Sequence, residues 1–518
     1  MLAVLILVLL VSAIPTSAQD GEWLERARVA LESGDLTTAR LAATNALSAD
    51  PKTADAEVVL GLVDTAENHL SAAAEHFGRA VSLQPNNYRA HAYLGSTYLR
   101  QEKVVEARKS FEKVLSLNPD NAAAHYNLGV ISLIGRNSSA ALPHFAAVVK
   151  ANASDTAGLI GLLECQLDLK QTAAADESAR KLGALLPSTS PALLQIGTTL
   201  ADVGDYPSAL AMFRKFVAGN PDSFDGHYNL ALAMLRTGAF DDAAVELEAI
   251  LGRIPKAEAY NLLGDVEEKR GHADKALRAF EQAAQMDPRN EDFTIDYGSA
   301  LINAGDLNRA VPVFAQAAGN WPHSVRSRLG LASAYYLAGK HEECARVLLE
   351  GIAVQPNATP LYDLLGKTFE AVPPLQPDIK GVFEKYVATH PNDAVACAHL
   401  GTMLYLTSAA EGVGRFARAK EQLRRAIAVN PRLAEAHLQL GIVAQAEGDL
   451  PQALASYQRA AALAPTLSAA RYRLGSVYRK LGNSEKAKAE LDQFRKLKAS
   501  EAQQEREQMI RSLSDVHK

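Results

Sequence analysis

Histidine and cysteine are the residues here whose chemistry most often builds metal sites or nucleophiles. The chain has 13 His and 3 Cys in 518 residues. Four of the His occupy one position of a sequence period: His91, His125, His227 and His437. Residues at one repeat position lie at least a repeat apart, whereas metal ligands must all lie about 2 Å from one ion. We therefore predict no metal site from this set and interpret each ring as packing against a neighbouring helix, with its edge hydrogen-bonded.

The three cysteines are also interpreted as structural residues. Cys344 takes a position otherwise filled by Ala, Cys397 takes a large-residue position, and Cys165 has no His or Asp motif beside it. Burial as small apolar side chains is favoured over a nucleophilic role. The metalloprotease, serine-hydrolase and phosphate-loop motifs are all missing from the sequence. The sequence thus predicts no catalytic residue, no cofactor and no enzyme.

Composition excludes further classes of function. Apolar residues make up 48% of the chain, aromatic residues 6% and charged residues 22%, and 53 basic against 59 acidic residues give a net charge of −6. A chain of that charge is not a strongly basic, nucleic-acid-binding protein. The abundance of Ala and Leu favours helices throughout. We expect an all-α protein that has no nucleic-acid partner.

The N-terminus has the pattern of an export signal. An apolar run from Leu2 to Val11 precedes Pro15 and small residues up to Ala18. We predict a signal peptide at 1–18 that is cleaved before Gln19, although the usual positive leader is absent. A buried helix and a misassigned start are the alternatives, and the run is too short for a membrane anchor. The prediction is a periplasmic or extracellular protein with no transmembrane segment in the mature chain, the alternative being a cytoplasmic one.

A period of 34 residues organises the rest of the chain. It is carried by prolines, most of them 34 residues apart: Pro51, Pro85, Pro119, Pro187, Pro221, Pro255, Pro288, Pro322, Pro356, Pro391, Pro431 and Pro465. A set of glycines (Gly61, Gly95, Gly129 and onwards), a set of alanines (Ala39, Ala73, Ala107 and onwards) and a set of aromatics (Phe77, Phe111, Phe145 and onwards) keep the same register. Four kinds of residue in register indicate a repeat architecture.

One repeat predicts a pair of helices. In residues 432–465, apolar residues recur four apart in each half, Gly448 and Asp449 separate the halves, and Pro465 ends the second. Gly441 and Ala453 lack bulk, so the two helices can approach closely. A single pair cannot bury its apolar surface alone, so each repeat must stack on the next.

This pattern resembles the tetratricopeptide repeat. The residues that carry the resemblance are Leu94, Gly95, Tyr98, Ala107, Phe111 and Pro119, in the order of the family signature. The resemblance implies a right-handed superhelical solenoid of about fourteen helix pairs over residues 19–499, whose first helices line a concave groove. Residues 500–518 are polar and are interpreted as a C-terminal capping helix or tail.

Some repeats depart from the pattern. The repeat at 154–187 has Leu163 in the glycine position and Ala179 in the aromatic position. The repeat at 357–391 has AVPPLQPD in place of a tight turn, and the next one is six residues too long, with SAAEGVGRF between its helices. The irregularity over 357–431 marks either tolerated turn insertions or a kink or protruding loop.

The resemblance also indicates where a partner would bind. In some superhelical relatives, groove asparagines hold the backbone of an extended peptide, and the matching positions here hold Asn127 and Asn229. Aromatic residues accompany them, so the candidate protein- or peptide-binding residues are Tyr93, Tyr126, Asn127, Tyr228 and Asn229. Packing of the tyrosines against the adjacent helix is an equal alternative. Further along, Asp265 and Glu268 make the expected groove acidic.

The predicted function is a non-catalytic scaffold for protein–protein interaction. The signal-like N-terminus favours a role in cell-envelope assembly. A periplasmic component of a polysaccharide export machine is one alternative, and a cytoplasmic adaptor is the other if the signal prediction is wrong. The sequence identifies no partner beyond a protein or peptide.

Overall fold

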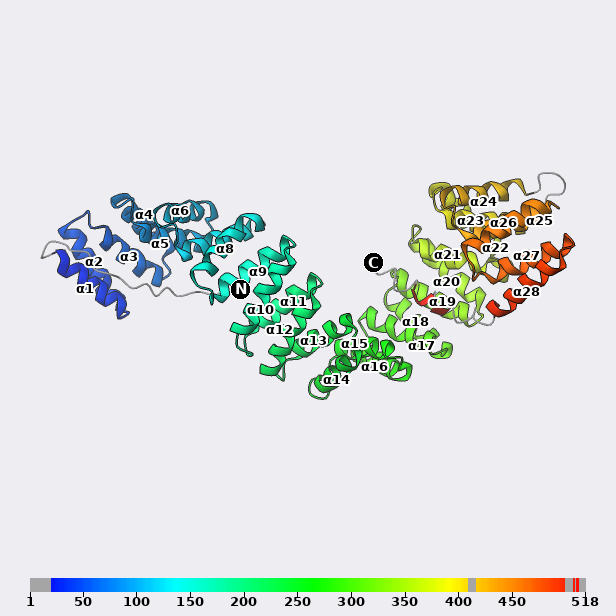
Figure 1. Cartoon of the computed structure of the whole chain (residues 1–518), viewed down its shortest axis with the longest axis horizontal. Coiled ribbons are helices and arrows are strands. Elements are labelled where there is room, and N and C mark those ends of the chain that lie inside the picture. The colour runs from blue at the N-terminus through cyan, green and yellow to red at the C-terminus, as the bar shows by residue number, and fades with distance from the viewer. Residues whose placement is uncertain (1–19, 409–415, 499–505, 508, 512–518) are drawn as a thin grey trace. The chain divides into compact units, whose positions relative to one another are not determined.

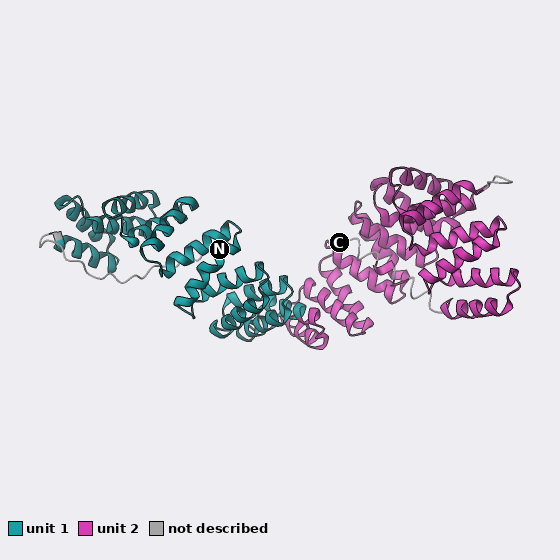
Figure 2. Cartoon of the chain, turned by 45° about the horizontal axis from the view of Figure 1, so that its top comes forward, with its two compact units in different colours: residues 1–233 teal, residues 234–518 magenta. Residues whose placement is uncertain are grey.

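The computed structural model describes residues 20–408, 416–498, 506, 507 and 509–511. These residues contain 28 α-helices and no strand, which makes fourteen consecutive pairs and confirms the all-α repeat prediction (Figure 1). The helices group into two compact units, residues 1–233 and 234–518 (Figure 2). The division falls inside helix α13, so no linker separates the units in sequence.

The first unit contains α1 (Asp20–Glu32), α2 (Leu36–Ala49), α3 (Ala54–Ala66), α4 (Leu70–Leu83), α5 (Tyr88–Arg100), α6 (Val104–Leu117), α7 (Ala122–Ile134), α8 (Ser138–Ala151), α9 (Thr156–Asp168), α10 (Thr172–Leu185), α11 (Pro191–Asp202), α12 (Tyr206–Gly219) and most of α13 (Phe224–Thr237).

The second unit contains α14 (Phe240–Leu251), α15 (Ala257–Lys269), α16 (Ala273–Met286), α17 (Glu291–Asn303), α18 (Leu307–Asn320), α19 (Val325–Leu337), α20 (His341–Val354), α21 (Thr359–Thr368), the 3₁₀ turns η1 (Phe369–Ala371) and η2 (Pro373–Leu375), α22 (Gln376–Thr389), α23 (Ala394–Leu406), α24 (Ala417–Val429), α25 (Ala434–Ala446), α26 (Leu450–Leu463), α27 (Ser468–Lys480) and α28 (Ser484–Lys498).

The turn inside most of the described pairs depends on one residue in the left-handed conformation. Gly448 has φ of +84°, as predicted for the turn between its two helices, and Gly34 and Gly204 have φ of +81° and +87°. The same position has positive φ in twelve of the fourteen pairs, and in four of them it is not glycine: Asn68, Glu102, Arg136 and Lys170. Glycine adopts this conformation without a Cβ penalty, which explains why it recurs there.

The histidines at the shared position form one repeated hydrogen bond. The Nε2 atom of His91, His125, His227 and His437 lies 2.9–3.1 Å from the carbonyl oxygen of the proline six residues earlier. Tyr362 donates its hydroxyl to Pro356 O in the same way, at 2.8 Å. Each ring edge thereby ties a first helix to the turn before it, which confirms the structural interpretation of the set.

Removing one of these rings should cost stability according to its burial. His227 is buried, with 8% of its surface exposed, whereas His437 is half-buried. We expect His227→Ala to lower the free energy of unfolding by about 1–2 kcal/mol, because a buried ring is lost together with its hydrogen bond to Pro221 O. Urea unfolding followed by circular dichroism measures the change. His437→Ala removes the same hydrogen bond at a more exposed site and should lower the free energy of unfolding by less. Equal losses of stability in the two variants would show that burial of the ring and its bond does not set the effect.

The glycine and aromatic sets meet in the core. A Cβ added to Gly61, Gly129 or Gly298 would lie within 3.0 Å of the ring of Phe77, Phe145 or Phe314, respectively. The aromatic ring that follows each glycine by 16 residues therefore packs directly on the backbone of the first helix. It fills the space that a side chain at the glycine position would occupy. Phe314 is 0% exposed and also faces Gly330 of the following repeat. One ring thus joins two repeats.

The departures from the pattern have local structural solutions. In the repeat at 154–187, Leu163 and Ala179 are both buried, so the bulk has moved from the second helix to the first. In the repeat at 357–391, the tight turn is replaced by η1 and η2. Most of the insertion between α23 and α24 lies at 409–415, outside the described residues.

The predicted signal peptide at 1–18 also lies outside the described residues, as does most of the predicted tail at 500–518. In that tail, Met509 is buried and packs, with Ile510, in a core cluster of residues from Ala276 to Ala436. Within the described ranges, no helix is both long and apolar enough to cross a bilayer.

Candidate binding groove

The first helices of successive pairs lie against one another within each unit. In the first unit α1 contacts α3 and α7 contacts α9; in the second, α17 contacts α19 and α23 contacts α25. In a curved stack of helix pairs, the helices on the inner side are the closer ones. Most of the contacts between alternate helices join first helices, and the second helices α10 and α12 also contact each other. This favours the first helices as the inner face of each unit, which is the face expected to form a groove.

Two of the predicted tyrosines lie on neighbouring first helices of the first unit. Tyr93 on α5 stacks on Phe77 with ring centroids 5.4 Å apart. Tyr126 on α7 meets Phe145 edge to face at 5.9 Å. Both tyrosines are half-buried, and burial raises the pKa of each hydroxyl. Each ring is therefore held by a buried aromatic while part of its surface faces solvent.

The remaining predicted residues are held by their own helix. Tyr228 stacks on Phe224 at 5.8 Å, one turn earlier on α13. The side-chain amide of Asn127 donates to Ala123 O, and that of Asn229 donates to Asp225 O, both at 2.8 Å. Each bond uses one of the two amide N–H groups, which leaves the other N–H and the oxygen for a further partner. Tyr93 and Tyr126 thus pack against an adjacent helix, as the packing alternative expects, whereas Tyr228 packs on its own helix α13. All three keep part of their surface accessible.

The acidic residues expected in the groove belong to a cluster of carboxyl groups in the second unit. Burial, Asp296 and Glu268 together raise the pKa of Asp265 to about 7. Asn261 of α15 donates to Asp296 Oδ2 of α17 at 3.0 Å, and Asn303 donates to Glu268 Oε1 at 3.4 Å. Two adjacent first helices thus hold three carboxyl groups close enough to affect one another's ionisation.

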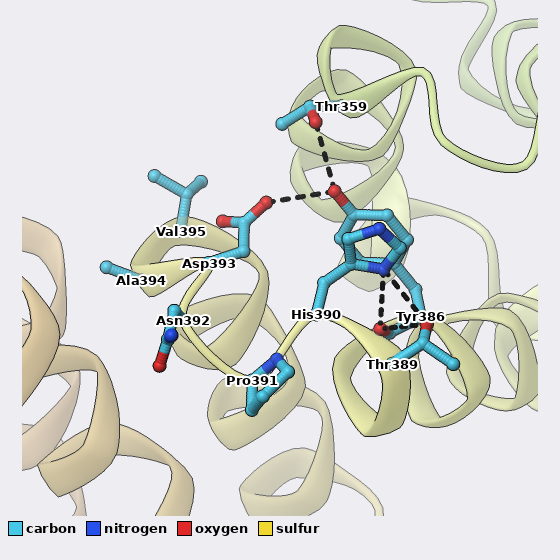
Figure 3. A pocket seen from close by; sticks show the side chains of 9 residues that line it. All are labelled: Thr359, Tyr386, Thr389, His390, Pro391, Asn392, Asp393, Ala394 and Val395. Atoms are coloured by element: carbon cyan, nitrogen blue, oxygen red, sulfur yellow. Dashed lines mark hydrogen bonds between the residues drawn. The ribbon is translucent and has the colours of Figure 1, made fainter.

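An open cavity of about 560 Å³ lies beside the irregular repeat, at the end of α22 (Figure 3). The Tyr386 hydroxyl lies 3.0 Å from Thr359 Oγ1 and donates to Asp393 Oδ2 at 3.1 Å, and the His390 ring stacks on Tyr386 at 4.3 Å. Asp393 Oδ1 accepts from Ala396 N at 3.0 Å and so caps α23. These contacts hold the turn between α22 and α23 together.

Sequence reasoning missed this cavity. The signal for it was the irregular turn AVPPLQPD, which displaces α22 from its regular position in the period, but nothing in the period itself points to Tyr386 or His390.

The cysteines have the properties of core residues. Cys165, Cys344 and Cys397 are each 0% exposed. Burial raises the pKa of Cys165 to about 11 and that of Cys344 to about 12, and it raises that of Cys397 as well. A thiol that stays protonated at neutral pH is a poor nucleophile. The interpretation of these residues as structural is therefore supported.

Comparisons with known proteins agree with the repeat pattern. One family model for the tetratricopeptide repeat matches residues 97–156, 194–258 and 408–468. A second model for the same repeat matches residues 64–126, 269–311, 301–367 and 444–505. A comparison with curated proteins found no match.

Similar solved structures include PilF of Pseudomonas aeruginosa, with 20% identity over 40% of this chain and 94% of that chain and a TM-score of 0.35. Yeast Tom70 has 16% identity over 86% of this chain and 97% of that chain, with a TM-score of 0.34. The segments matched by the two repeat models together make up more than half of the sequence, and the chain therefore belongs to the tetratricopeptide repeat family.

Proposed function

We propose that this protein is a non-catalytic scaffold that binds an extended segment of a partner protein along the first helices of residues 20–233. Proteins built from this repeat typically act as protein-interaction scaffolds. The observation that carries the proposal is the support of Tyr93 and Tyr126 on buried phenylalanines. A ring held in place loses little entropy on binding and offers both apolar area and a polar tip.

Asn127 and Asn229 supply the polar part of the proposed site. Each retains an amide N–H and an oxygen beyond its bond to its own helix. That donor–acceptor pair matches the N–H and C=O of an extended peptide backbone, which binds without requiring a particular side chain. The signal-like residues 1–18 and this surface together favour an exported protein that acts in cell-envelope assembly.

The proposal is tested by capture with the full chain. The tagged protein is used to isolate partners from the envelope and cytosolic fractions of its own cells, and the partners are identified by mass spectrometry. Tyr126→Ala together with Tyr228→Ala should abolish capture of a stoichiometric envelope partner while leaving the helical circular dichroism unchanged, because truncating interface tyrosines removes most of their binding energy.

Replacing two half-buried tyrosines of the second unit, Tyr335→Ala with Tyr336→Ala, is the matched control and should leave capture intact. Unchanged capture by the Tyr126 and Tyr228 variant would refute the groove assignment. Exclusive capture of cytosolic proteins, by a chain that keeps residues 1–18, would refute export.

A further inference from the structure

An unusual cluster of ionisable side chains surrounds the turn between α3 and α4. Asp64 lies near the end of α3, Glu67 and His69 lie in the turn, and each offers a ligand atom within 4.8 Å of the other two. His69 Nδ1 is 3.2 Å from Glu67 Oε2. Around a tetrahedral zinc ion with bonds of about 2.0–2.1 Å, neighbouring ligand atoms lie roughly 3.3 Å apart. The turn therefore already holds nitrogen and oxygen donors near coordination spacing.

Only one of the two oxygens of the buried carboxylate in this cluster has a hydrogen bond. Asp64 is 2% exposed, and its Oδ1 accepts from Arg40 at 2.7 Å. Its Oδ2 is buried and has no hydrogen-bond partner, and His76 Nε2 lies 3.5 Å from it. A buried carboxylate oxygen without a donor is costly, so the site favours a cation that can reach it.

In the second unit, the buried carboxylate at the equivalent repeat position has both of its oxygens paired. Glu267 occupies the repeat position of Asp64, and His272 that of His69. Glu267 is 1% exposed, yet both of its oxygens are paired: Oε1 with Arg270 Nη1 and Oε2 with His272 Nδ1, each at 2.7 Å. The cation there is an arginine of the turn itself.

In the first unit, the position of Arg270 is taken by Glu67. The turn therefore carries an additional negative charge where its counterpart carries a positive one. Arg40 of the preceding repeat bridges Asp64 Oδ1 and Glu67 Oε2, both at 2.7 Å, but its own side chain is 38% exposed. A partly exposed arginine can move into solvent when a stronger cation takes its place.

We propose that the α3–α4 turn binds one Zn²⁺ ion through Asp64, Glu67 and His69. Two carboxylates and an imidazole suit zinc, and three protein ligands leave a position for water or for His76. The ion would join the end of one helix to the start of the next and so fix the turn of that pair. Because the site lies on a single turn, it is independent of the proposed peptide groove.

Isothermal titration of the full chain with Zn²⁺ alone tests the proposal. Wild-type protein should bind Zn²⁺ saturably, with one site that His69→Ala weakens more than about tenfold, as loss of a ligand requires. His69 is 63% exposed, so this variant should fold normally. Arg40→Gln should strengthen binding, because it removes the competing cation. His272→Ala is the matched control at the same repeat position, and it should leave the affinity unchanged.

Three results would overturn the proposal. The first is no saturable binding by the wild type and by Arg40→Gln. The second is equal affinity in His69→Ala. The third is loss of binding in His144→Ala alone, which would assign the ion to the His125–His144 pair, whose Nδ1 atoms lie 3.0 Å apart.

Discussion

Gly330→Ala should lower the free energy of unfolding by about 2–3 kcal/mol, although alanine is the better helix former. The added methyl carbon would lie 2.2 Å from the ring of Phe314. That ring is fully buried, and it also lies within 3.0 Å of the position that a Cβ would take on Gly298. Because the ring is packed between Gly298 and Gly330, it cannot shift away from the new methyl group. Either the two repeats must separate or the ring must leave its rotamer. Urea unfolding followed by circular dichroism measures the loss.

The matched control is the same substitution at an open position. Gly319 lies on α18 with no atom within 4 Å of its potential Cβ. Gly319→Ala should therefore stabilise the protein by about 0.5–1 kcal/mol through helix propensity alone. If both variants shift stability in the same direction, the contact between ring and glycine is not what holds adjacent repeats together.

Asp265→Asn should make the protein more stable at pH 8 and change it far less at pH 5. Burial, with Asp296 and Glu268 nearby, raises the pKa of Asp265 from 3.8 to about 7 in the folded chain. Between these values the folded state holds a proton that the unfolded state has released, so wild-type stability falls as the pH rises from about 4 to 7. Each pKa unit corresponds to about 1.4 kcal/mol, so the loss between pH 5 and pH 8 reaches up to about 3 kcal/mol.

Asparagine carries no charge at either pH and should flatten this dependence. Urea unfolding of both proteins across pH 4–8 gives the comparison. Asp120→Asn, at an exposed aspartate of the first unit, should reproduce the wild-type curve. A wild-type curve that rises over this range, or an Asp265→Asn curve parallel to it, would contradict the assignment of the pKa shift to Asp265.

The repeat itself was readable from the sequence. Gly448 at the turn, Pro465 after the second helix and the 34-residue spacing predicted helix pairs, and the structure has them. Such features are local, because the φ angle of a turn and the end of a helix depend on a few adjacent residues. The role of His227 as a packed, hydrogen-bonded ring was also predictable, since a period separates equivalent residues too far for shared chemistry.

Tertiary structure alone decided which side chains face each other across helices. The glycine and aromatic sets were visible in the sequence, but the insertion of Phe314 between Gly298 and Gly330 depends on how two repeats stack. The unpaired oxygen of Asp64 depends on the reach of Arg40 from the preceding repeat. The period specifies backbone positions shared by all repeats, whereas charge pairing, burial and pKa shifts arise from the residues that differ between neighbours, and those meet only once the repeats have stacked.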